Sequence, residues 1–321
     1  MTVDRWTSDL FRQLEILGAK PSHLSSPTEV REIHRAVMET NGPGPRMDRT
    51  SDHVTQSADG AEVALRVLVA RPNPKAVIVY YHGGGWVAGS IDEAETIVGK
   101  LAERTNCAFV LVDYRLAPEN PYPAAVEDAY AALKWAAANV ADIAGKEVPL
   151  AVAGDDAGAN LAAVVARRAR DNGDVRLAMQ ILVCPMLDSE VDPTFDDGLV
   201  DQLWVTSDTV RWRWDQYVPD TASRNDPDVS PLQATTLDGL PSTVLVIPDL
   251  SPSAAGAEAY ARRLSDAGVE VNAVRYVDQV HGFFTLMMLR EGERAFQQII
   301  RAVRATLAHQ SRSSAKPSVK E

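Results

Sequence analysis

A glycine-flanked aspartate is the residue of this 321-residue chain whose setting most clearly indicates chemistry. The segment Gly154-Asp155-Asp156-Ala157-Gly158 follows an apolar run at 149–153 and precedes an apolar helical pattern that opens at Asn160. A strand, a sharp turn between glycines and a helix expose the central side chain, an arrangement called a nucleophile elbow. The central residue is Asp156, so the elbow offers a carboxylate. A carboxylate can transfer a proton, orient a base or attack saturated carbon.

A second cluster lies upstream, where an apolar strand-like run at 75–81 leads into His82-Gly83-Gly84-Gly85-Trp86. Three consecutive glycines allow backbone N–H groups to converge on one point, which suits the binding of an oxyanion. A glycine run alone is as well explained by a plain turn. The combination with an elbow further along the chain favours the oxyanion interpretation.

These motifs resemble those of the hormone-sensitive-lipase-like family of α/β-hydrolases, the bacterial carboxylesterases with an HGGGW motif. The resemblance covers about residues 8–308 and continues in Asp113-Tyr114-Arg115-Leu116-Ala117-Pro118-Glu119, Tyr122-Pro123-Ala124-Ala125, Glu127-Asp128, Ser230-Pro231-Leu232 and His281-Gly282-Phe283-Phe284. It implies an α/β-hydrolase fold and a Ser-His-Asp triad for ester hydrolysis.

Two of the three triad positions implied by the resemblance hold a different residue. The nucleophile position is Asp156, and the position of the acid, normally an Asp-Pro pair, is Ser251. Asp249 and Asp278 lie nearby, but neither aligns with the family's acid. His281 alone matches its family counterpart. The fold therefore follows from the resemblance more readily than the activity does.

The carboxylate of Asp156 restricts the chemistry. Attack on an ester carbonyl would form a mixed anhydride at least as reactive as the ester, which disfavours an acyl intermediate. Attack on a carbon–halogen bond or an epoxide would give a stable alkyl ester, and His281 would then serve as the base of the second step. Such enzymes usually also have a carboxylate behind the histidine, and Ser251 cannot provide it.

We therefore expect Asp156 to face His281 and to form a charge-assisted hydrogen bond with the imidazole. This dyad would transfer protons during elimination, isomerisation or cyclisation of a small or medium apolar carbonyl compound. Backbone N–H groups of Gly83, Gly84 and Ala157 would form the oxyanion hole. Asp156 is itself anionic, however, and its carboxylate would block the oxyanion hole if it bound these N–H groups.

Two alternatives remain open for the function. The first is a non-catalytic pseudo-hydrolase that keeps the pocket to bind a small ligand, which would be recovered unchanged after long incubation. The second is a residual esterase, or a hydrolase with Asp156 as its nucleophile, which an assay with a chromogenic short-chain ester would detect.

Composition limits the partners. A net charge of −12 and a pI near 5.0 argue against nucleic acid and anionic membranes. The glycines match no nucleotide-binding pattern, and no residues have metal-ligand spacing, so we expect a small-molecule substrate, no cofactor and no metal. The resemblance allows a homodimer. With no signal peptide or membrane span in the sequence, and with Cys107 and Cys184 in apolar runs, we expect a cytoplasmic protein with buried thiols.

The elements expected to position these residues alternate between strand and helix. Strands are predicted near 61–70, 75–81, 107–113, 149–153, 179–184, 243–248 and 270–276. Helices are predicted near 91–104, 124–139, 158–171, 207–218, 253–268 and 291–307. This alternation predicts an α/β protein with a mostly parallel central sheet and helices on both faces.

The domain organisation expected is a single α/β-hydrolase domain over 1–308, followed by a disordered tail at 309–321. Amphipathic helices within 1–48 and an insertion at 188–225 lie outside the alternation, and the resemblance places them as a cap over the active site. The insertion contains Trp204, Trp212 and Trp214, which are otherwise explained as ordinary core residues.

Overall fold

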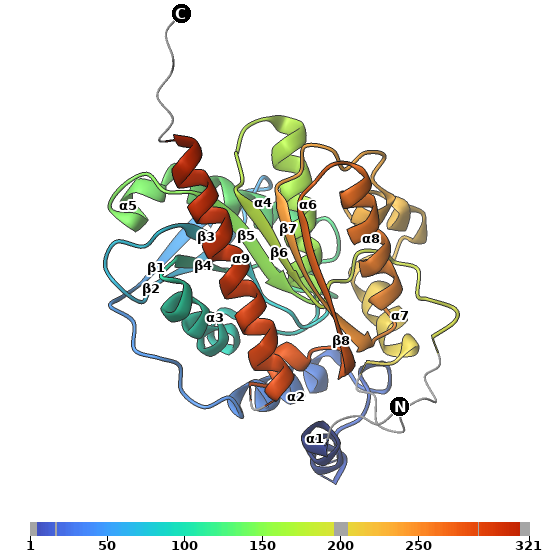
Figure 1. Cartoon of the computed structure of the whole chain (residues 1–321). Helices are drawn as coiled ribbons and strands as arrows, with labels where there is room; N and C mark the ends of the chain where they lie inside the picture. Colours follow the sequence, from blue (N-terminus) through green and yellow to red (C-terminus); the bar gives the residue numbers. More distant parts are fainter. Residues whose placement is uncertain (1–4, 17, 196–204, 288, 315–321) are drawn as a thin grey trace, which may run out of the picture.

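An eight-stranded, mostly parallel sheet forms the centre of the computed structural model, which describes residues 5–16, 18–195, 205–287 and 289–314 (Figure 1). The strand order is β1-β2-β4-β3-β5-β6-β7-β8, with only the pairs β1–β2 and β2–β4 antiparallel. The strands are β1 (Arg49–Gln56), β2 (Glu62–Val69), β3 (Val77–Tyr81), β4 (Ala108–Asp113), β5 (Leu150–Asp155), β6 (Met179–Val183), β7 (Ser242–Leu250) and β8 (Val271–Val280). The α/β class predicted from the sequence is confirmed.

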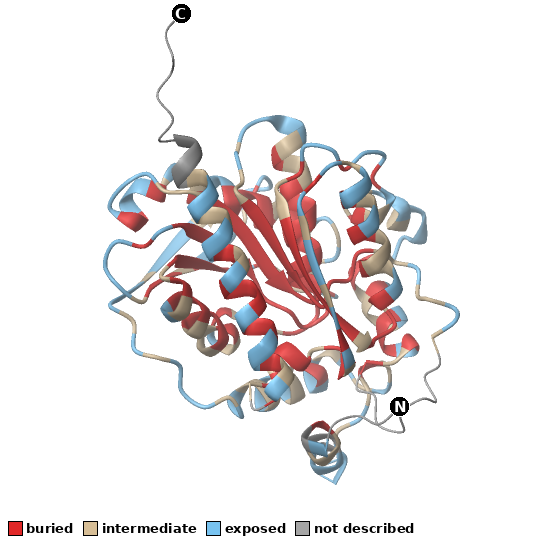
Figure 2. Cartoon of the chain, viewed as in Figure 1, coloured by how far each residue is buried: buried red, intermediate tan, exposed pale blue. Residues whose placement is uncertain are grey.

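Helices cover both faces of this sheet, α3 and α9 on one face and α4, α6 and α8 on the other (Figure 1). The helices are α1 (Arg5–Ile16), α2 (Pro27–Glu39), α3 (Ile91–Thr105), α4 (Ala124–Ala138), α5 (Val140–Ala144), α6 (Ala157–Asn172), α7 (Ser207–Tyr217), α8 (Ala254–Asp266) and α9 (Arg290–Ser314). The central strands are buried throughout (Figure 2), as expected for continuous apolar runs between two helical layers.

The structure differs from the sequence prediction at three places. The polar segment of β1 forms an edge strand that is largely exposed on both faces, so it has no alternating apolar pattern to reveal it. The short helix α5 is also absent from the sequence prediction. Helix α9 continues to Ser314, into the tail expected to be disordered, and residues 315–321 lie outside the described residues.

The segments expected to form a cap lie at the carboxyl ends of the parallel strands, where α1, α2 and α7 gather (Figure 1). Trp214 of α7 is fully buried, and its ring centroid lies 4.4 Å from that of Trp86 in the glycine loop. Trp86 also stacks on Tyr217 at 4.4 Å. Trp212 is partly buried, whereas Trp204 lies outside the described residues. The aromatic side chains of α7 thus pack into the core and hold this helix against the glycine loop.

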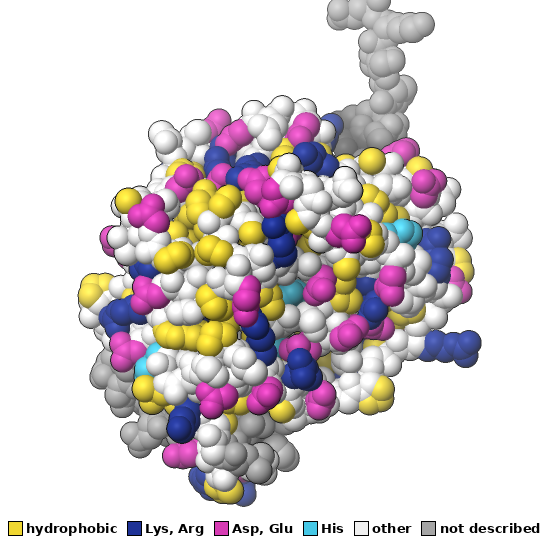
Figure 3. Space-filling view, turned by 180° about the vertical axis from the view of Figure 1, so that it is seen from behind, with side chains coloured by type: hydrophobic (Ala, Val, Ile, Leu, Met, Phe, Trp, Pro, Cys, Tyr) yellow, Lys and Arg dark blue, Asp and Glu magenta, His cyan; other side chains and the backbone are white. Residues whose placement is uncertain are grey.

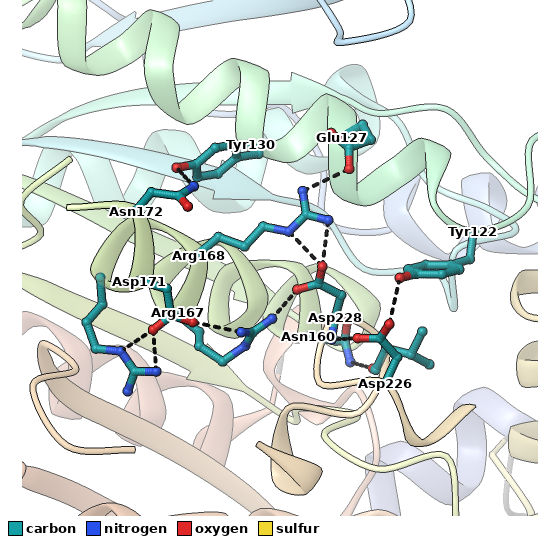
Figure 4. A network of polar contacts seen from close by, with 12 residues as sticks. Tyr122, Glu127, Tyr130, Asn160, Arg167, Arg168, Asp171, Asn172, Asp226 and Asp228 are labelled. Atoms are coloured by element: carbon teal, nitrogen blue, oxygen red, sulfur yellow. Dashed lines mark hydrogen bonds and ion pairs between the residues drawn. The ribbon is translucent and has the colours of Figure 1, made fainter. Parts of the chain in front are cut away.

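A polar network holds α6, the helix that follows the elbow, against the rest of the fold (Figure 4). Arg167 and Arg168 both pair with Asp228, and Arg168 also binds Glu127 of α4 at 2.9 Å. The buried Asn160 donates to two main-chain carbonyl groups, at 2.7 and 2.8 Å. Asn160 thus fixes the first turn of α6, next to the elbow, and the two arginines fix its later turns.

The surface is mixed in charge on the face that Figure 3 shows, where acidic and basic side chains are interspersed. Both cysteines, Cys107 and Cys184, are free and buried. None of the helices, within the residues that the structure describes, is long and apolar enough to cross a membrane.

Candidate active site

The elbow between β5 and α6 holds Asp156 in a left-handed backbone conformation, with φ of 52°. The two glycines around it are sterically required. A β-carbon on Gly154 would lie 2.3 Å from the carbonyl carbon of Gly158, and one on Gly158 would lie 1.9 Å from the carbonyl oxygen of Tyr81. The sequence pattern therefore forms the strained turn that it predicts, with the Asp156 side chain at its tip.

Asp156 and His281 are in contact. The Oδ1 atom of Asp156 lies 3.0 Å from Nε2 of His281, and both residues are buried, with exposed fractions of 6% and 7%. On the other side of the ring, the Ser251 hydroxyl lies 2.9 Å from Nδ1, and the Ser253 hydroxyl lies 3.4 Å from it. The imidazole is thus held between a carboxylate and two hydroxyls. This is a Ser-His-Asp arrangement with its two ends exchanged.

Neither of the two aspartates considered as substitutes for the acid has a recorded hydrogen bond to His281 among the described residues. The Asp249 carboxylate accepts a hydrogen bond from Arg275 at 2.5 Å and one from the backbone N–H of Asp278 at 3.4 Å. The hydrogen bonds of the His281 ring in the described part of the chain involve instead Asp156, Ser251 and Ser253.

The carboxylate of Asp156 lies at the glycine loop, where the sequence predicts the oxyanion hole. Its Oδ2 atom accepts hydrogen bonds from the backbone N–H groups of Gly84 at 3.0 Å and Gly85 at 2.8 Å. The N–H of Gly83, expected as a donor, binds Asp155 Oδ1 at 3.0 Å instead. Ala157 is buried at the first position of α6. Sequence reasoning missed Gly85, although it is the third glycine of the same run.

Arg213 of α7 is a further site residue that sequence reasoning missed. Its Nη1 atom lies 3.4 Å from each carboxylate oxygen of Asp156, and its side chain is only 12% exposed. The side chain passes over Gly85, where a β-carbon would lie 2.4 Å from Arg213 Cδ. The signal in the sequence is a single basic residue between Trp212 and Trp214, which nothing along the chain connects to the elbow.

These neighbours stabilise the charge on Asp156. Burial disfavours ionisation, but the charge of Arg213, the hydrogen bond and charge of His281 and the N–H of Gly84 outweigh it. Together they hold the pKa of Asp156 far below its usual range. A carboxylate stabilised in this way is a weak base and a weak nucleophile.

The adjacent Asp155 behaves in the opposite way. Its Oδ1 atom accepts hydrogen bonds from the Tyr80 hydroxyl at 2.7 Å and from the N–H of Gly83. Burial, together with the nearby charge of Asp156, nevertheless raises the pKa of Asp155 to about 6. Two neighbouring carboxyl groups thus differ in charge state under mildly acidic conditions.

A cavity of about 140 Å³ opens onto this cluster from beneath the cap. Its polar wall contains Lys20, Ser22, His34, Asp155, Asp156, Arg213, His281 and Thr285. Its apolar wall comes mainly from α2 and contains Val30, Ile33, Val37, Met38, Val205 and Leu286. The described residues include no group of three or more His, Cys, Asp or Glu placed to hold a metal ion. The arrangement suits a small, largely apolar organic molecule.

Comparison with known proteins shows that this chain is similar to several esterases and to a receptor. The family profile described as alpha/beta hydrolase fold matches residues 78–285. The carboxylic ester hydrolase LipN of Mycobacterium tuberculosis is 34% identical over 286 residues, which span 86% of this chain and 72% of LipN. The gibberellin receptor GID1A of Arabidopsis thaliana is 31% identical over 218 residues, 65% of this chain and 63% of the receptor.

Solved structures agree with the sequence relatives. A hyperthermophilic esterase from the archaeon Pyrobaculum calidifontis superimposes with a TM-score of 0.86 at 32% identity, covering 95% of this chain and 99% of that one. An esterase from Pseudomonas putida superimposes equally well, with a TM-score of 0.86 at 30% identity, over 96% of this chain and 97% of the esterase.

Proposed function

Because this chain belongs to the hormone-sensitive-lipase-like family of α/β-hydrolases and yet holds a carboxylate in its oxyanion hole, we propose that it binds a small ligand without cleaving esters. It keeps the esterase fold, the elbow, the glycine loop and the histidine. The ligand would lie in the cavity between the elbow and α2.

One observation carries this proposal: the carboxylate of Asp156 accepts hydrogen bonds from the backbone N–H groups of Gly84 and Gly85. These N–H groups would have to bind the oxygen of a reacting carbonyl as it becomes negative. Losing a single oxyanion donor typically slows such enzymes by about 10²–10³-fold. Here two donors already bind the Asp156 carboxylate, which imitates the charged intermediate that the hole would otherwise stabilise.

The imidazole of His281 supports the same conclusion. Asp156 is bound at Nε2 and the Ser251 hydroxyl at Nδ1, so both ring nitrogens already have a partner. A general base needs a nitrogen within hydrogen-bond reach of the proton it removes. A ligand in the cavity would have to displace Asp156 to reach one.

The relatives are consistent with either binding or catalysis. Proteins named as esterases and a protein named as a receptor occur at similar identity, 34% and 31%. Fold and family therefore leave the choice to the side chains of the site. In this chain, those side chains favour binding.

A second candidate function is proton transfer by Asp156 and His281, in an elimination, isomerisation or cyclisation of an apolar carbonyl compound. The 3.0 Å contact between the two side chains favours it, because a ligand that displaced the carboxylate from the glycines would meet a positioned acid–base pair. Exchange of the α-protons of a ketone such as cyclohexanone in D₂O would report this chemistry. Exchange that D156A and H281A abolish would support proton transfer over simple binding.

The proposed function predicts no turnover of p-nitrophenyl acetate or butyrate beyond the rate of the folded variant H281A. The reason is that neither Asp156 nor His281 is free to activate water. Initial rates at pH 7.5, with D156A as a second control, provide the measurement. Saturable hydrolysis by the wild-type protein that both variants lose would show the protein to be an esterase after all.

A further inference from the structure

The guanidinium of Arg213 has N–H groups for which the described structure supplies no partner. Guanidinium has five such groups, and the contacts of Arg213 with Asp156 involve Nη1 alone, at a long 3.4 Å. Other buried arginines of this protein are much better paired. Arg168, for example, binds Asp228 and Glu127 through three nitrogens, at 2.6 to 2.9 Å.

The poorly paired guanidinium of Arg213 faces the cavity. The side chain of Arg213 is 12% exposed and lies in the wall of the cavity. A ligand with suitable acceptors would gain charged hydrogen bonds from these free N–H groups. Planar oxyanions match the guanidinium fork best, because they accept two parallel hydrogen bonds.

The charge of Asp156 does not exclude a second anion here. Its Oδ2 atom is bound by Gly84 and Gly85, and its Oδ1 atom by His281, so other groups besides Arg213 stabilise this carboxylate. Lys20 adds another positive charge in the wall of the same cavity. The remaining N–H groups of Arg213 are therefore open to a different carboxylate.

The opposite wall indicates the rest of the ligand. Helix α2 contributes Val30, Ile33, Val37 and Met38 to the cavity, an apolar surface facing the charged cluster. A ligand that satisfies both walls has one anionic end and an apolar body that fits about 140 Å³.

We propose that the cavity is a binding site for small apolar monocarboxylic acids, whose carboxylate pairs with Arg213 while the hydrocarbon body lies against α2. This inference rests on the proposed function and specifies its ligand. The acid is also what an ester hydrolase releases, so the protein would hold a product-like molecule. The oxyanion hole cannot receive that carboxylate, because Asp156 fills it, and Arg213 offers the alternative position.

Calorimetric titration with hexanoate and with methyl hexanoate tests the proposal on the full chain at pH 7.5. Wild-type protein should bind the acid more tightly than the ester. R213Q should weaken hexanoate binding at least about tenfold, as expected for loss of a charged hydrogen-bonded pair. R213K keeps the charge but lacks the guanidinium fork, so its affinity for hexanoate should lie between those of the wild type and R213Q.

The matched control is R211Q on the same helix, because Arg211 is exposed and pairs with Asp208 outside the cavity. R211Q should bind hexanoate as the wild type does, and the melting temperature of each variant shows that it is folded. Equal or tighter binding of the ester, unchanged binding by folded R213Q, or no binding of any straight-chain acid from butanoate to octanoate would overturn the inference. Release of methanol from methyl hexanoate, followed by NMR, would instead contradict the proposed function.

Discussion

Exchanging the two residues that flank His281, in the double variant D156S/S251D, is expected to raise the hydrolysis of short-chain esters at least about 10³-fold above the wild-type protein. The exchange places a hydroxyl at Nε2 of the imidazole and a carboxylate at Nδ1, where Asp156 and Ser251 now lie at 3.0 and 2.9 Å. It also frees the N–H groups of Gly84 and Gly85 to bind an oxyanion.

The single variants separate the two contributions. D156S restores the nucleophile and empties the hole but leaves a hydroxyl behind the histidine, and loss of the correct acid costs serine hydrolases about 10⁴-fold in turnover. S251D adds a second buried carboxylate next to His281 while the hole stays occupied, so we expect no hydrolysis from it. The gain of the double variant should therefore far exceed the product of the single gains.

The measurements are kcat/KM for p-nitrophenyl butyrate and labelling by a fluorophosphonate, with circular dichroism to show that each variant is folded. Labelling at position 156 in the double variant is the expected result. A folded double variant that neither hydrolyses the ester nor takes up the label would contradict the view that these two side chains disable the site.

Replacing Asp155 by asparagine is expected to change the pH dependence of stability by about 2 kcal/mol between pH 4.5 and 7.5. The folded pKa of Asp155 is raised from 3.8 to about 6, so the folded state holds this proton more tightly than the unfolded chain does. The stabilising contribution is therefore present at low pH and is lost as the pH rises through about 6. Asparagine carries no charge, so the stability of D155N should not fall in this way as the pH rises.

Urea unfolding of wild type and D155N at the two pH values measures the effect. The substitution keeps an acceptor for the Tyr80 hydroxyl and the Gly83 N–H, because both donate to Oδ1. D155N should gain stability relative to wild type as the pH rises.

The variant Y80F provides a second test of the same carboxyl group. Without the donor that lowers the pKa of Asp155, the loss of stability should move to higher pH. An equal stability difference between D155N and wild type at both pH values would show that Asp155 is not buried as a neutral acid.

Most of the fold was predictable from the sequence because the buried strands are continuous apolar runs between turn signals. The exception, β1, is an exposed edge strand whose polar sequence carries no periodic signal. The contact between Asp156 and His281 was also predictable, since two local motifs with a known relative placement contain the two residues.

The rest of the site depends on contacts between distant segments. Arg213 reaches Asp156 from a helix 57 residues further along the chain, and the packing of Trp214 and Tyr217 against Trp86 helps to determine where that helix lies. Whether the Gly83 N–H faces Asp155 or the hole depends on the path of the glycine loop. No local sequence pattern encodes the position of Arg213 or the direction of the Gly83 N–H. Both features change the chemistry that the motifs alone suggest.

The titration of the Asp156 carboxyl group tests the central claim most directly. In ¹³C NMR spectra of protein labelled at the aspartate carboxyl carbons, D156N and D155N assign the two resonances. We predict that the Asp156 resonance keeps the shift of an ionised carboxylate down to acid unfolding, while that of Asp155 titrates at about pH 6. Protonation of Asp156 at or above the ordinary aspartate pKa, in the folded protein, would show that the carboxylate does not occupy the oxyanion hole.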